Sequence, residues 1–359
     1  MNDNKICFLI HSLNAGGAER TVSYLVNYIS KQKYDIDLVI YGDVGCYDLE
    51  ANVNLIRLIS TPKNCSIIKK LCVAIKRFFS FKKYLRENKP KVIFCMLYPS
   101  ILYCLFSRKI IISSERSNPA YLKGFKKIVR NTLFMLSDGV VFQTERAKNF
   151  YSKRIQKRGI VISNAVGNPE AYKIEFSGKR RKAIVAIGSL KREKDYYTLI
   201  HACKKVFEKY SDYVLEIYGD GYLKNDLNNL SVNLGLSEKI KFMGVQKNVL
   251  SLVKDASCYV LSSESEGMPN ALMEALAIGL PCVSTNCPNG PSELINDEYN
   301  GILVPVGDAE KLSNAIIRII EDEQLANKLS TNAKKILETN NIEVISQKYL
   351  NFIESFIQK

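Results

Sequence analysis

The segment SESEGMPNALMEALAIGLP, Ser263 to Pro281, is the stretch from which the fold can be worked out. It follows Cys258–Leu261, an apolar run (CYVL) that suits a buried parallel strand. Pro269 is tolerated in the first turn of a helix, so a helix is expected over Asn270–Ala277. Gly279 favours a left-handed helix end, and the proline that follows prevents continuation. Strand, loop, helix and a further apolar run in this order predict a parallel sheet covered by helices.

The same alternation extends in both directions along the chain. The strands expected upstream are Ile6–His11, Ile36–Tyr41, Val92–Met96, Lys109–Ser113 and Gly139–Phe142, and those downstream are Ala183–Ile187, Val214–Tyr218, Ile240–Phe242, Cys258–Leu261 and Pro281–Thr285. The alternation lapses over Asn164–Lys182, which is rich in Gly, Pro, Asn and basic residues. We therefore predict an α/β protein with two doubly wound, Rossmann-like domains, residues 1–170 and 171–340, and a C-terminal helix over residues 341–359.

Length and composition are consistent with two globular domains. The chain has 359 residues, of which 47% are hydrophobic and 24% charged. The first residues have no basic start like that of a signal peptide, and the most apolar stretch, Val92–Phe106, is interrupted by Pro99 and is shorter than the roughly 20 residues that span a bilayer. Ten cysteines without a C-x-x-C pair indicate reduced thiols, and two histidines are too few for a histidine-rich metal centre. We expect an intracellular protein without a metal site.

Charge is distributed unevenly. The formal net charge is +15, and residues 1–160 hold 28 Lys/Arg against 11 Asp/Glu, whereas residues 161–359 hold 23 against 25. A basic first half indicates an anionic partner such as nucleic acid, a phospholipid surface or a phosphate-bearing substrate. Because no nucleic-acid-binding module is present, nucleic acid is not expected.

The most basic stretch is Ile67–Arg86, IIKKLCVAIKRFFSFKKYLR, with seven Lys/Arg and no acidic residue. Its apolar positions fit an amphipathic helix, with a break expected near Ser80. Lys123, Lys126, Lys127 and Arg130 continue the charge. Such a face suits an anionic lipid surface, and a solvated face on a core helix is the alternative.

Two carboxylates, Glu266 and Glu274, flank the start of the helix in the opening segment, with seven residues between them. A carboxylate accepts hydrogen bonds from two hydroxyls, which suits the diols of sugars and ribose. The unpaired N–H groups near residues 267–270 suit an anion or sugar hydroxyls. For an isolated pair of glutamates, solvated side chains on a helix face would be the simpler interpretation.

The whole string resembles the retaining glycosyltransferases of family 4, which have the two-domain GT-B fold. The resemblance covers essentially the entire chain and includes members that build bacterial capsule, O-antigen and lipid-linked oligosaccharides. It implies that two domains face a cleft and that the C-terminal helix crosses back to the first domain. It places Glu266 beside the donor sugar and Glu274 on the nucleotide ribose. The backbone of Gly267, Met268, Pro269 and Asn270 would hold sugar hydroxyls and phosphate.

A second match follows the first strand of the second domain, in Gly188-Ser189-Leu190-Lys191-Arg192-Glu193-Lys194. It resembles the family's phosphate-binding turn, and Lys194 stands at the lysine position. Ser189 stands where the family usually has arginine, so Arg192 or Lys191 would supply the second positive charge. Cations here would stabilise the departing diphosphate. The segment Gly219-Asp220-Gly221 resembles a further family segment near the nucleotide.

Matches in the first domain are less specific. Gly16 and Gly17 precede a helix and resemble the family's turn at the donor phosphates, although a plain strand–helix turn is equally consistent with two glycines. Arg116, in SERSNP, is the candidate contact for an acceptor phosphate. The family's histidine after the fourth strand is missing from Cys95-Met96-Leu97-Tyr98.

The resemblance implies transfer of a hexose or N-acetylhexosamine, with retention, from a nucleotide diphosphate sugar, by family preference a UDP-sugar. Glu266 and Lys194 would form the catalytic centre without a metal or other cofactor, with Glu266 not acting as a covalent nucleophile. The expected acceptor is a lipid-diphosphate-linked glycan or polysaccharide, and the expected location is the cytoplasmic face of the cell membrane. The alternatives are another GT-B enzyme, such as a sugar-nucleotide 2-epimerase, and a non-catalytic protein of the membrane surface.

Overall fold

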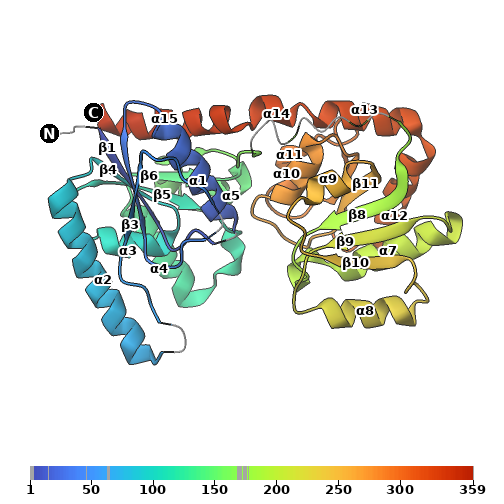
Figure 1. The fold of residues 1–359 in the computed structure, drawn as a ribbon, viewed down its shortest axis with the longest axis horizontal. Coiled ribbons are helices and arrows are strands. Elements are labelled where there is room, and N and C mark those ends of the chain that lie inside the picture. Colours follow the sequence, from blue (N-terminus) through green and yellow to red (C-terminus); the bar gives the residue numbers. More distant parts are fainter. Residues whose placement is uncertain are drawn as a thin grey trace. The chain divides into compact units, whose positions relative to one another are not determined.

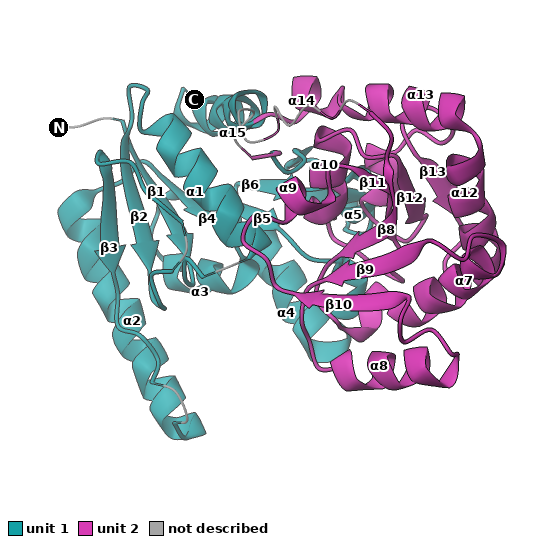
Figure 2. Ribbon diagram, turned by 45° about the vertical axis from the view of Figure 1, so that its right-hand side comes forward, with its two compact units in different colours: residues 1–165, 342–359 teal, residues 166–341 magenta. Residues whose placement is uncertain are grey.

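The computed structural model describes residues 4–14, 16–45, 47–62, 65–167, 172, 176 and 178–358. The chain forms two compact units, residues 1–165 with 342–359 (unit 1) and residues 166–341 (unit 2), which Figure 2 colours separately. The sequence had suggested boundaries after residues 170 and 340. Each unit is a parallel sheet between two layers of helices, as predicted.

Unit 1 is built on a seven-stranded sheet in the order β3-β2-β1-β4-β5-β6-β7, with every neighbouring pair parallel. The strands are β1 (Lys5–Ile10), β2 (Asp35–Ile40), β3 (Val53–Arg57), β4 (Val92–Cys95), β5 (Ile110–Glu115), β6 (Gly139–Phe142) and β7 (Gly159–Val161). Because side chains alternate along a strand, β1 sends Ile6, Phe8 and Ile10 into one core and Cys7 and Leu9 into the other. Strands buried on both faces explain the continuous apolar runs in the sequence.

The helices of unit 1 are α1 (Gly17–Ile29), α2 (Ile67–Asn88), α3 (Ile101–Cys104), α4 (Gly124–Met135), α5 (Glu145–Asn149), α6 (Lys153–Gln156) and α15 (Ile342–Ile357), with short 3₁₀ turns η1 (Tyr98–Ser100) and η2 (Pro119–Tyr121). One core is closed by α1 and α15, and the other by α2, α3, α4 and α6. Figure 1 shows α15, the last helix of the chain, beside α1. The predicted return of the C-terminal helix to the first domain is therefore confirmed.

Unit 2 is built on a six-stranded parallel sheet in the order β10-β9-β8-β11-β12-β13. Its strands are β8 (Arg181–Ile187), β9 (Val214–Tyr218), β10 (Ile240–Gly244), β11 (Ala256–Leu261), β12 (Cys282–Thr285) and β13 (Ile302–Val304). Its helices are α7 (Tyr196–Lys209), α8 (Lys224–Asn233), α9 (Val249–Val253), α10 (Asn270–Ala277), α11 (Pro291–Leu294), α12 (Ala309–Glu321), α13 (Glu323–Ala333) and α14 (Ile336–Thr339), with the 3₁₀ turn η4 (Arg192–Lys194).

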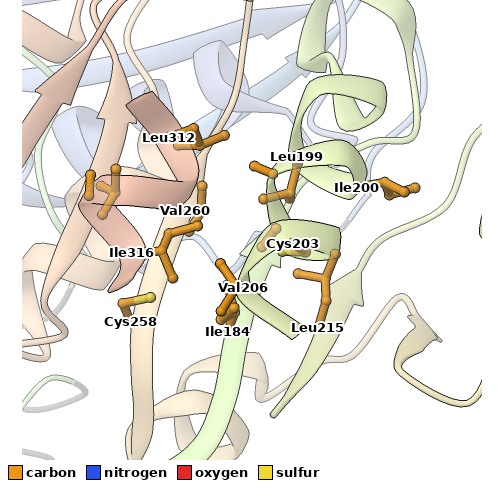
Figure 3. Close-up of a cluster of buried hydrophobic side chains, with 14 of the residues drawn as sticks. Ile184, Leu199, Ile200, Cys203, Val206, Leu215, Cys258, Val260, Leu312 and Ile316 are labelled. Atoms are coloured by element: carbon orange, nitrogen blue, oxygen red, sulfur yellow. The ribbon is translucent and has the colours of Figure 1, made fainter. Parts of the chain in front are cut away.

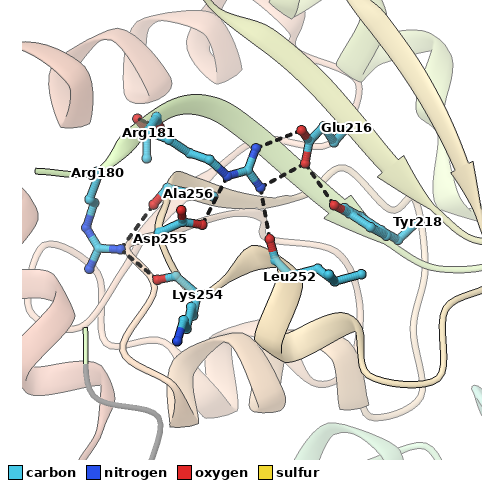
Figure 4. Close-up of polar contacts among 9 residues, drawn as sticks. Arg180, Arg181, Glu216, Tyr218, Leu252, Lys254, Asp255 and Ala256 are labelled. Carbon is cyan, nitrogen blue, oxygen red and sulfur yellow. Dashed lines mark hydrogen bonds and ion pairs between the residues drawn. The ribbon is translucent and has the colours of Figure 1, made fainter. Parts of the chain in front are cut away.

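The two faces of this second sheet carry separate cores. Figure 3 shows the first, where Ile184 of β8 and Val260 of β11 meet Leu199 and Val206 of α7 and Ile316 of α12. The other core lies under α10. At the amino ends of the strands, Arg181 donates to both carboxylate oxygens of Glu216 (2.7 and 2.9 Å) and to Asp255 (3.0 Å), a planar fork that joins β8, β9 and the turn before β11 (Figure 4).

Helix α2 runs without interruption from Ile67 to Asn88, so the break expected near Ser80 is wrong. Arg77, Phe81, Tyr84 and Leu85 are buried on both sides of that serine, and their packing outweighs its modest helix propensity. Within the described part of the chain, no helix combines the length and apolar character required to cross a membrane.

Candidate functional site

The topology of unit 2 indicates where a ligand binds. The sheet grows from β8 through β9 to β10 on one side, and from β11 through β12 to β13 on the other. The loops that follow β8 and β11 therefore leave the sheet at the carboxyl ends of these adjacent strands and turn in opposite directions. In open α/β sheets, ligands bind at this topological switch point, beyond the carboxyl ends of the strands. These two loops contain Lys194 and Glu266.

The two loops are joined by side-chain and backbone hydrogen bonds. Lys194 Nζ lies 2.6 Å from Glu266 Oε1. The hydroxyl of Ser262 donates to the carbonyl of Lys194 (2.8 Å), and the N–H of Glu264 donates to the carbonyl of Glu193 (2.9 Å). The residue that follows the η4 turn is Asp195, whose left-handed backbone (φ 45°) and side-chain cap on Thr198 fix the start of α7. The position of Lys194 is thus set by its backbone as well as by its ammonium group.

Glu266 is held from two directions. Its side chain is 9% exposed, and the same Oε1 accepts from Lys194 and from the hydroxyl of Ser263 (2.6 Å). Ser263 is itself fully buried, and its carbonyl accepts from the hydroxyl of Thr285 at the end of β12 (2.6 Å). A carboxylate fixed in this way is a pre-oriented acceptor for hydroxyls of a bound ligand.

Glycines let two further loops approach this edge closely. At Gly219 (φ 148°) and at Gly221, a side chain would collide with the backbone of Gly188 and Leu190, respectively. The N–H of Leu190 donates to the carbonyl of Asp220 (3.0 Å), which ties the loop after β9 to the predicted phosphate turn. At Gly290 (φ 95°), a side chain would meet the ring of Pro269. The loop after β12 therefore packs against the start of α10.

Helix α10 begins at Asn270 and ends at Ala277, the bounds predicted from its flanking residues, and Gly279 adopts the expected left-handed conformation (φ 71°). No side chain caps its amino end. The first N–H groups of the helix have no intrahelical acceptor and carry a partial positive charge, which suits an anionic ligand. Glu274 lies one turn further along and is partly exposed.

Burial around the site acts on neighbouring titratable groups. Burial raises the pKa of the Cys287 thiol to about 12, and the charge of Glu266 adds to this shift. Burial and the same carboxylate raise the pKa of Tyr196, whose hydroxyl donates to the carbonyl of Gly188 (3.1 Å). Both groups are therefore neutral near pH 7.

The remaining predicted residues lie on the same loops or in unit 1. Ser189 is partly exposed and Lys191 and Arg192 are exposed, so the structure does not single out one of them as the second cation. In unit 1, Gly17 is the first residue of α1, and Gly16 precedes it in an extended conformation. The hydroxyl of Tyr47 donates to the carbonyl of Gly16 (3.1 Å). The functional roles given to these residues stay predictions.

Arg116 follows β5 and is bound within unit 1. Its guanidinium donates to Thr21 Oγ1 (2.6 Å), to Asn164 Oδ1 (2.7 Å) and to Tyr349 Oη (3.0 Å). The sequence suggested a contact with an acceptor phosphate, which stays a prediction. Of the residues that support the site, the sequence reasoning missed Ser262 and Ser263, although polar residues directly after a buried strand are the signal that points to them.

A separate hollow of about 480 Å³ lies elsewhere in unit 2, between the segment 292–303 and the helices α13 and α14. Ile295 and Ile336 contribute to its lining, with Tyr299 and several asparagines. None of the predicted donor residues lines it. It is therefore distinct from the edge that holds Lys194 and Glu266.

Comparison with known proteins shows which enzymes the chain is similar to. Residues 168–336, which make up nearly all of unit 2, match the family model for glycosyl transferases group 1. The chain is 28% identical over 355 residues to an alpha-1,4-N-acetyl-D-galactosaminyltransferase of Campylobacter jejuni, and the match covers 97% of this chain and 98% of the relative. A UDP-Gal:alpha-D-GlcNAc-diphosphoundecaprenol alpha-1,3-galactosyltransferase of Escherichia coli is 33% identical over 181 residues, 49% of this chain and 46% of the relative.

Solved structures share the fold at lower identity. HepE of Anabaena in complex with UDP superposes with a TM-score of 0.81 at 17% identity, over 98% of this chain and 100% of HepE. Sucrose-phosphate synthase of Thermosynechococcus elongatus gives a TM-score of 0.83 at 17% identity, over 99% of both chains. The fold is GT-B. Residues 168–336 thus resemble a group 1 glycosyltransferase domain, and the chain is a glycosyltransferase.

Proposed function

We propose that this enzyme transfers a hexose or N-acetylhexosamine from a UDP-sugar, with retention at the anomeric carbon, to a lipid-diphosphate-linked glycan in bacterial surface polysaccharide synthesis. The observation that carries the donor half of the proposal is the pairing of Lys194 with Glu266 at the switch point of unit 2 (2.6 Å). A cation, a fixed carboxylate and the positive end of a helix dipole meet there, and these groups complement a diphosphate joined to a sugar.

In the proposed complex each group has a separate task. Lys194 and the N–H groups at the start of α10 stabilise the charge that develops on the departing diphosphate. Glu266 accepts hydrogen bonds from the donor sugar, with Gly267, Met268 and Pro269 beside it, and Glu274 accepts from the ribose hydroxyls. Ser189 and either Lys191 or Arg192 complete the phosphate contacts.

For the reaction itself, we propose attack by the acceptor hydroxyl on the same face of the sugar that the diphosphate leaves. The new glycosidic bond forms as the bond from the anomeric carbon to the phosphate oxygen breaks, and a diphosphate oxygen accepts the hydroxyl proton. No covalent sugar–enzyme intermediate is required, and Glu266 is not a nucleophile. We propose that no metal takes part, so transfer should persist in EDTA.

The acceptor half of the proposal rests on relatives. The Campylobacter jejuni enzyme is named for a GalNAc-containing acceptor on diphosphoundecaprenol, and the Escherichia coli enzyme for an acceptor on the same carrier. Other relatives are named for lipopolysaccharide core synthesis in Rhizobium meliloti and for amylovoran synthesis in Erwinia amylovora. A lipid carrier of this kind presents its glycan at a membrane surface.

Helix α2 supports a position at that surface, the cytoplasmic face of the membrane in our proposal. Five large apolar side chains on it are at least half exposed, namely Ile67, Ile68, Leu71, Ile75 and Phe79. They lie along one side of the helix, whereas Val73 and Phe81 are buried against the sheet. Exposed lysines recur at seven-residue intervals beside them, at 69, 76 and 83. An apolar stripe flanked by cations fits the interface of an anionic bilayer.

Sedimentation with lipid vesicles tests this part of the proposal. A Leu71→Glu variant should bind phosphatidylglycerol vesicles less than the wild type, because it places a carboxylate in the apolar stripe. The matched control is Val232→Glu, which changes an apolar side chain of similar exposure (55% against 61% for Leu71) on α8 of unit 2 and should bind as the wild type does. Equal binding by Leu71→Glu and the wild type would exclude α2 as the contact.

The activity is tested by supplying a panel of UDP-, GDP- and ADP-sugars with and without a polyprenyl-diphosphate glycan. We expect release of UDP that depends on the acceptor, and an α-linked product from an α-linked donor. A change of the donor sugar without any acceptor would instead identify a 2-epimerase. A product with inverted configuration would contradict retention.

A further inference from the structure

The guanidinium of Arg116 joins three parts of unit 1 that are far apart in the sequence. Thr21 lies in α1, one turn after Gly17, and its hydroxyl in turn donates to the carbonyl of Gly17 (2.9 Å). Asn164 is the second-last residue before the chain passes into unit 2, and α15 contributes Tyr349 after the chain returns. The Arg116 side chain therefore connects the turn at Gly16 and Gly17 with the last segment before unit 2 and with the helix that follows unit 2.

The network is buried and oriented. Thr21 is 5% exposed, Asn164 2% and Tyr349 0%. The amide of Gln143, the residue directly after β6, also donates to Asn164 Oδ1 (2.7 Å), so that this oxygen accepts from two fixed donors. A planar guanidinium can reach three separate acceptors at once, which the single ammonium of lysine cannot do with the same geometry.

We propose that Arg116 is a positioning residue that fixes the Gly16–Gly17 turn relative to the two chain segments connecting the units. This inference rests on the proposed function and on the contact with the donor phosphates that the family resemblance implies for this turn. Arg116 then affects the reaction through the start of α1. Removal of the guanidinium frees Thr21 and the first turn of α1, and a turn that samples several positions holds a diphosphate less well.

The network offers a variant that separates this role from direct contact with an acceptor. Tyr349 is completely buried, so Tyr349→Phe cannot alter a substrate contact, and it removes the acceptor of one Arg116 bond. Tyr34→Phe is its matched control, because the Tyr34 hydroxyl also bonds to α15, at Glu354 (2.6 Å), away from Arg116. Arg158→Gln is the control for Arg116→Gln, since Arg158 also donates inside unit 1, to the carbonyls of Met135 and Ser137.

The experiment measures steady-state kinetics and amide hydrogen exchange of the full-length variants. Arg116→Gln should raise the donor KM or lower kcat by roughly 10- to 100-fold, the equivalent of a lost hydrogen bond to a charged group, with the acceptor KM unchanged. Tyr349→Phe should shift the same parameter in the same direction by a smaller factor. The double variant should be no worse than Arg116→Gln alone, and Arg116→Lys should recover only part of the loss.

Hydrogen exchange provides a readout that needs no turnover. Residues 17–25 should exchange faster in substrate-free Arg116→Gln and Tyr349→Phe than in the wild type or in either control. A rise in acceptor KM in Arg116→Gln, with Tyr349→Phe like the wild type, would overturn the proposal in favour of direct acceptor contact. Lower thermal stability with unchanged kinetics and unchanged exchange in residues 17–25 would overturn it as well. If the wild type transfers no sugar, the proposed function fails. The exchange measurement still tests whether Arg116 holds the start of α1 in place.

Discussion

Replacing Lys194 by methionine should destabilise unit 2 and abolish most of the activity, for two separable reasons. Methionine keeps the unbranched side chain as far as Cε and removes the charged ammonium group. The Glu266 carboxylate, 9% exposed, then retains only the Ser263 hydroxyl on Oε1. Stranding a buried carboxylate costs about 3–5 kcal/mol when its only partner is lost. Because Ser263 remains and Lys194 is 22% exposed, we expect about 2 kcal/mol.

A double-mutant cycle isolates the effect of Lys194→Met on the unfolding free energy of unit 2. Glu266→Gln in the Lys194→Met background removes the stranded charge, so the double variant should regain about 1 kcal/mol over Lys194→Met. Native-state hydrogen exchange of β11 in increasing urea reports the unfolding free energy of unit 2 separately from that of unit 1. Lys182→Met is the control. Its ion pair with Asp212 is half exposed on both sides, so no measurable loss is expected.

The effect of losing Lys194 on catalysis is measured as kcat. If Lys194 stabilises the departing diphosphate, its loss should lower kcat by roughly 10²- to 10³-fold, as is typical when one stabilising group at a developing charge is removed. The double variant should regain stability and no activity. Full turnover in Lys194→Met would refute the assignment of the leaving-group role. A stability equal to that of the wild type would refute the argument that Lys194 neutralises a buried carboxylate.

Two further predictions concern the stability of unit 2. Arg181→Met should lower its unfolding free energy by about 2–3 kcal/mol, because Glu216 is 7% exposed and would lose both bonds of the fork, and urea titration followed by hydrogen exchange of β9 would measure this. Burial raises the pKa of Cys258 to about 12, above its ordinary value of 9.0. The unfolded chain therefore loses this proton first as the pH rises, and stability should fall between pH 9 and 12, by roughly 1 kcal/mol at pH 10. The urea midpoint of Cys258→Ala should decline less over this range, and an equal decline would contradict the assignment.

The sequence was most informative where the determinants are local. Helix α10 was predicted with its observed bounds, because Pro269, Gly279 and the apolar flanks act within a few residues. The alternation of strands and helices predicted both parallel sheets, since strands buried on two faces have few polar residues. The continuity of α2 was not predicted, because the residues that hold it together act through contacts with the sheet and not through their order around Ser80.

The same distinction explains why the contacts of Lys194 and those of Arg116 could be predicted to different depths. In unit 2, Lys194 and Glu266 each follow a strand, and the switch between β8 and β11 brings any residues at those two places to one edge. Their meeting thus follows from the topology, which the strand pattern already predicts. The partners of Arg116 lie 48, 95 and 233 residues away, at positions that no strand end or motif marks. The sequence pattern can mark this arginine as a candidate site residue. Which groups it binds is determined only by the packing of α1 and α15 on one face of the first sheet. For that reason, the variant that best tests its role is one in Tyr349, a residue that the sequence placed only within the C-terminal helix predicted over residues 341–359.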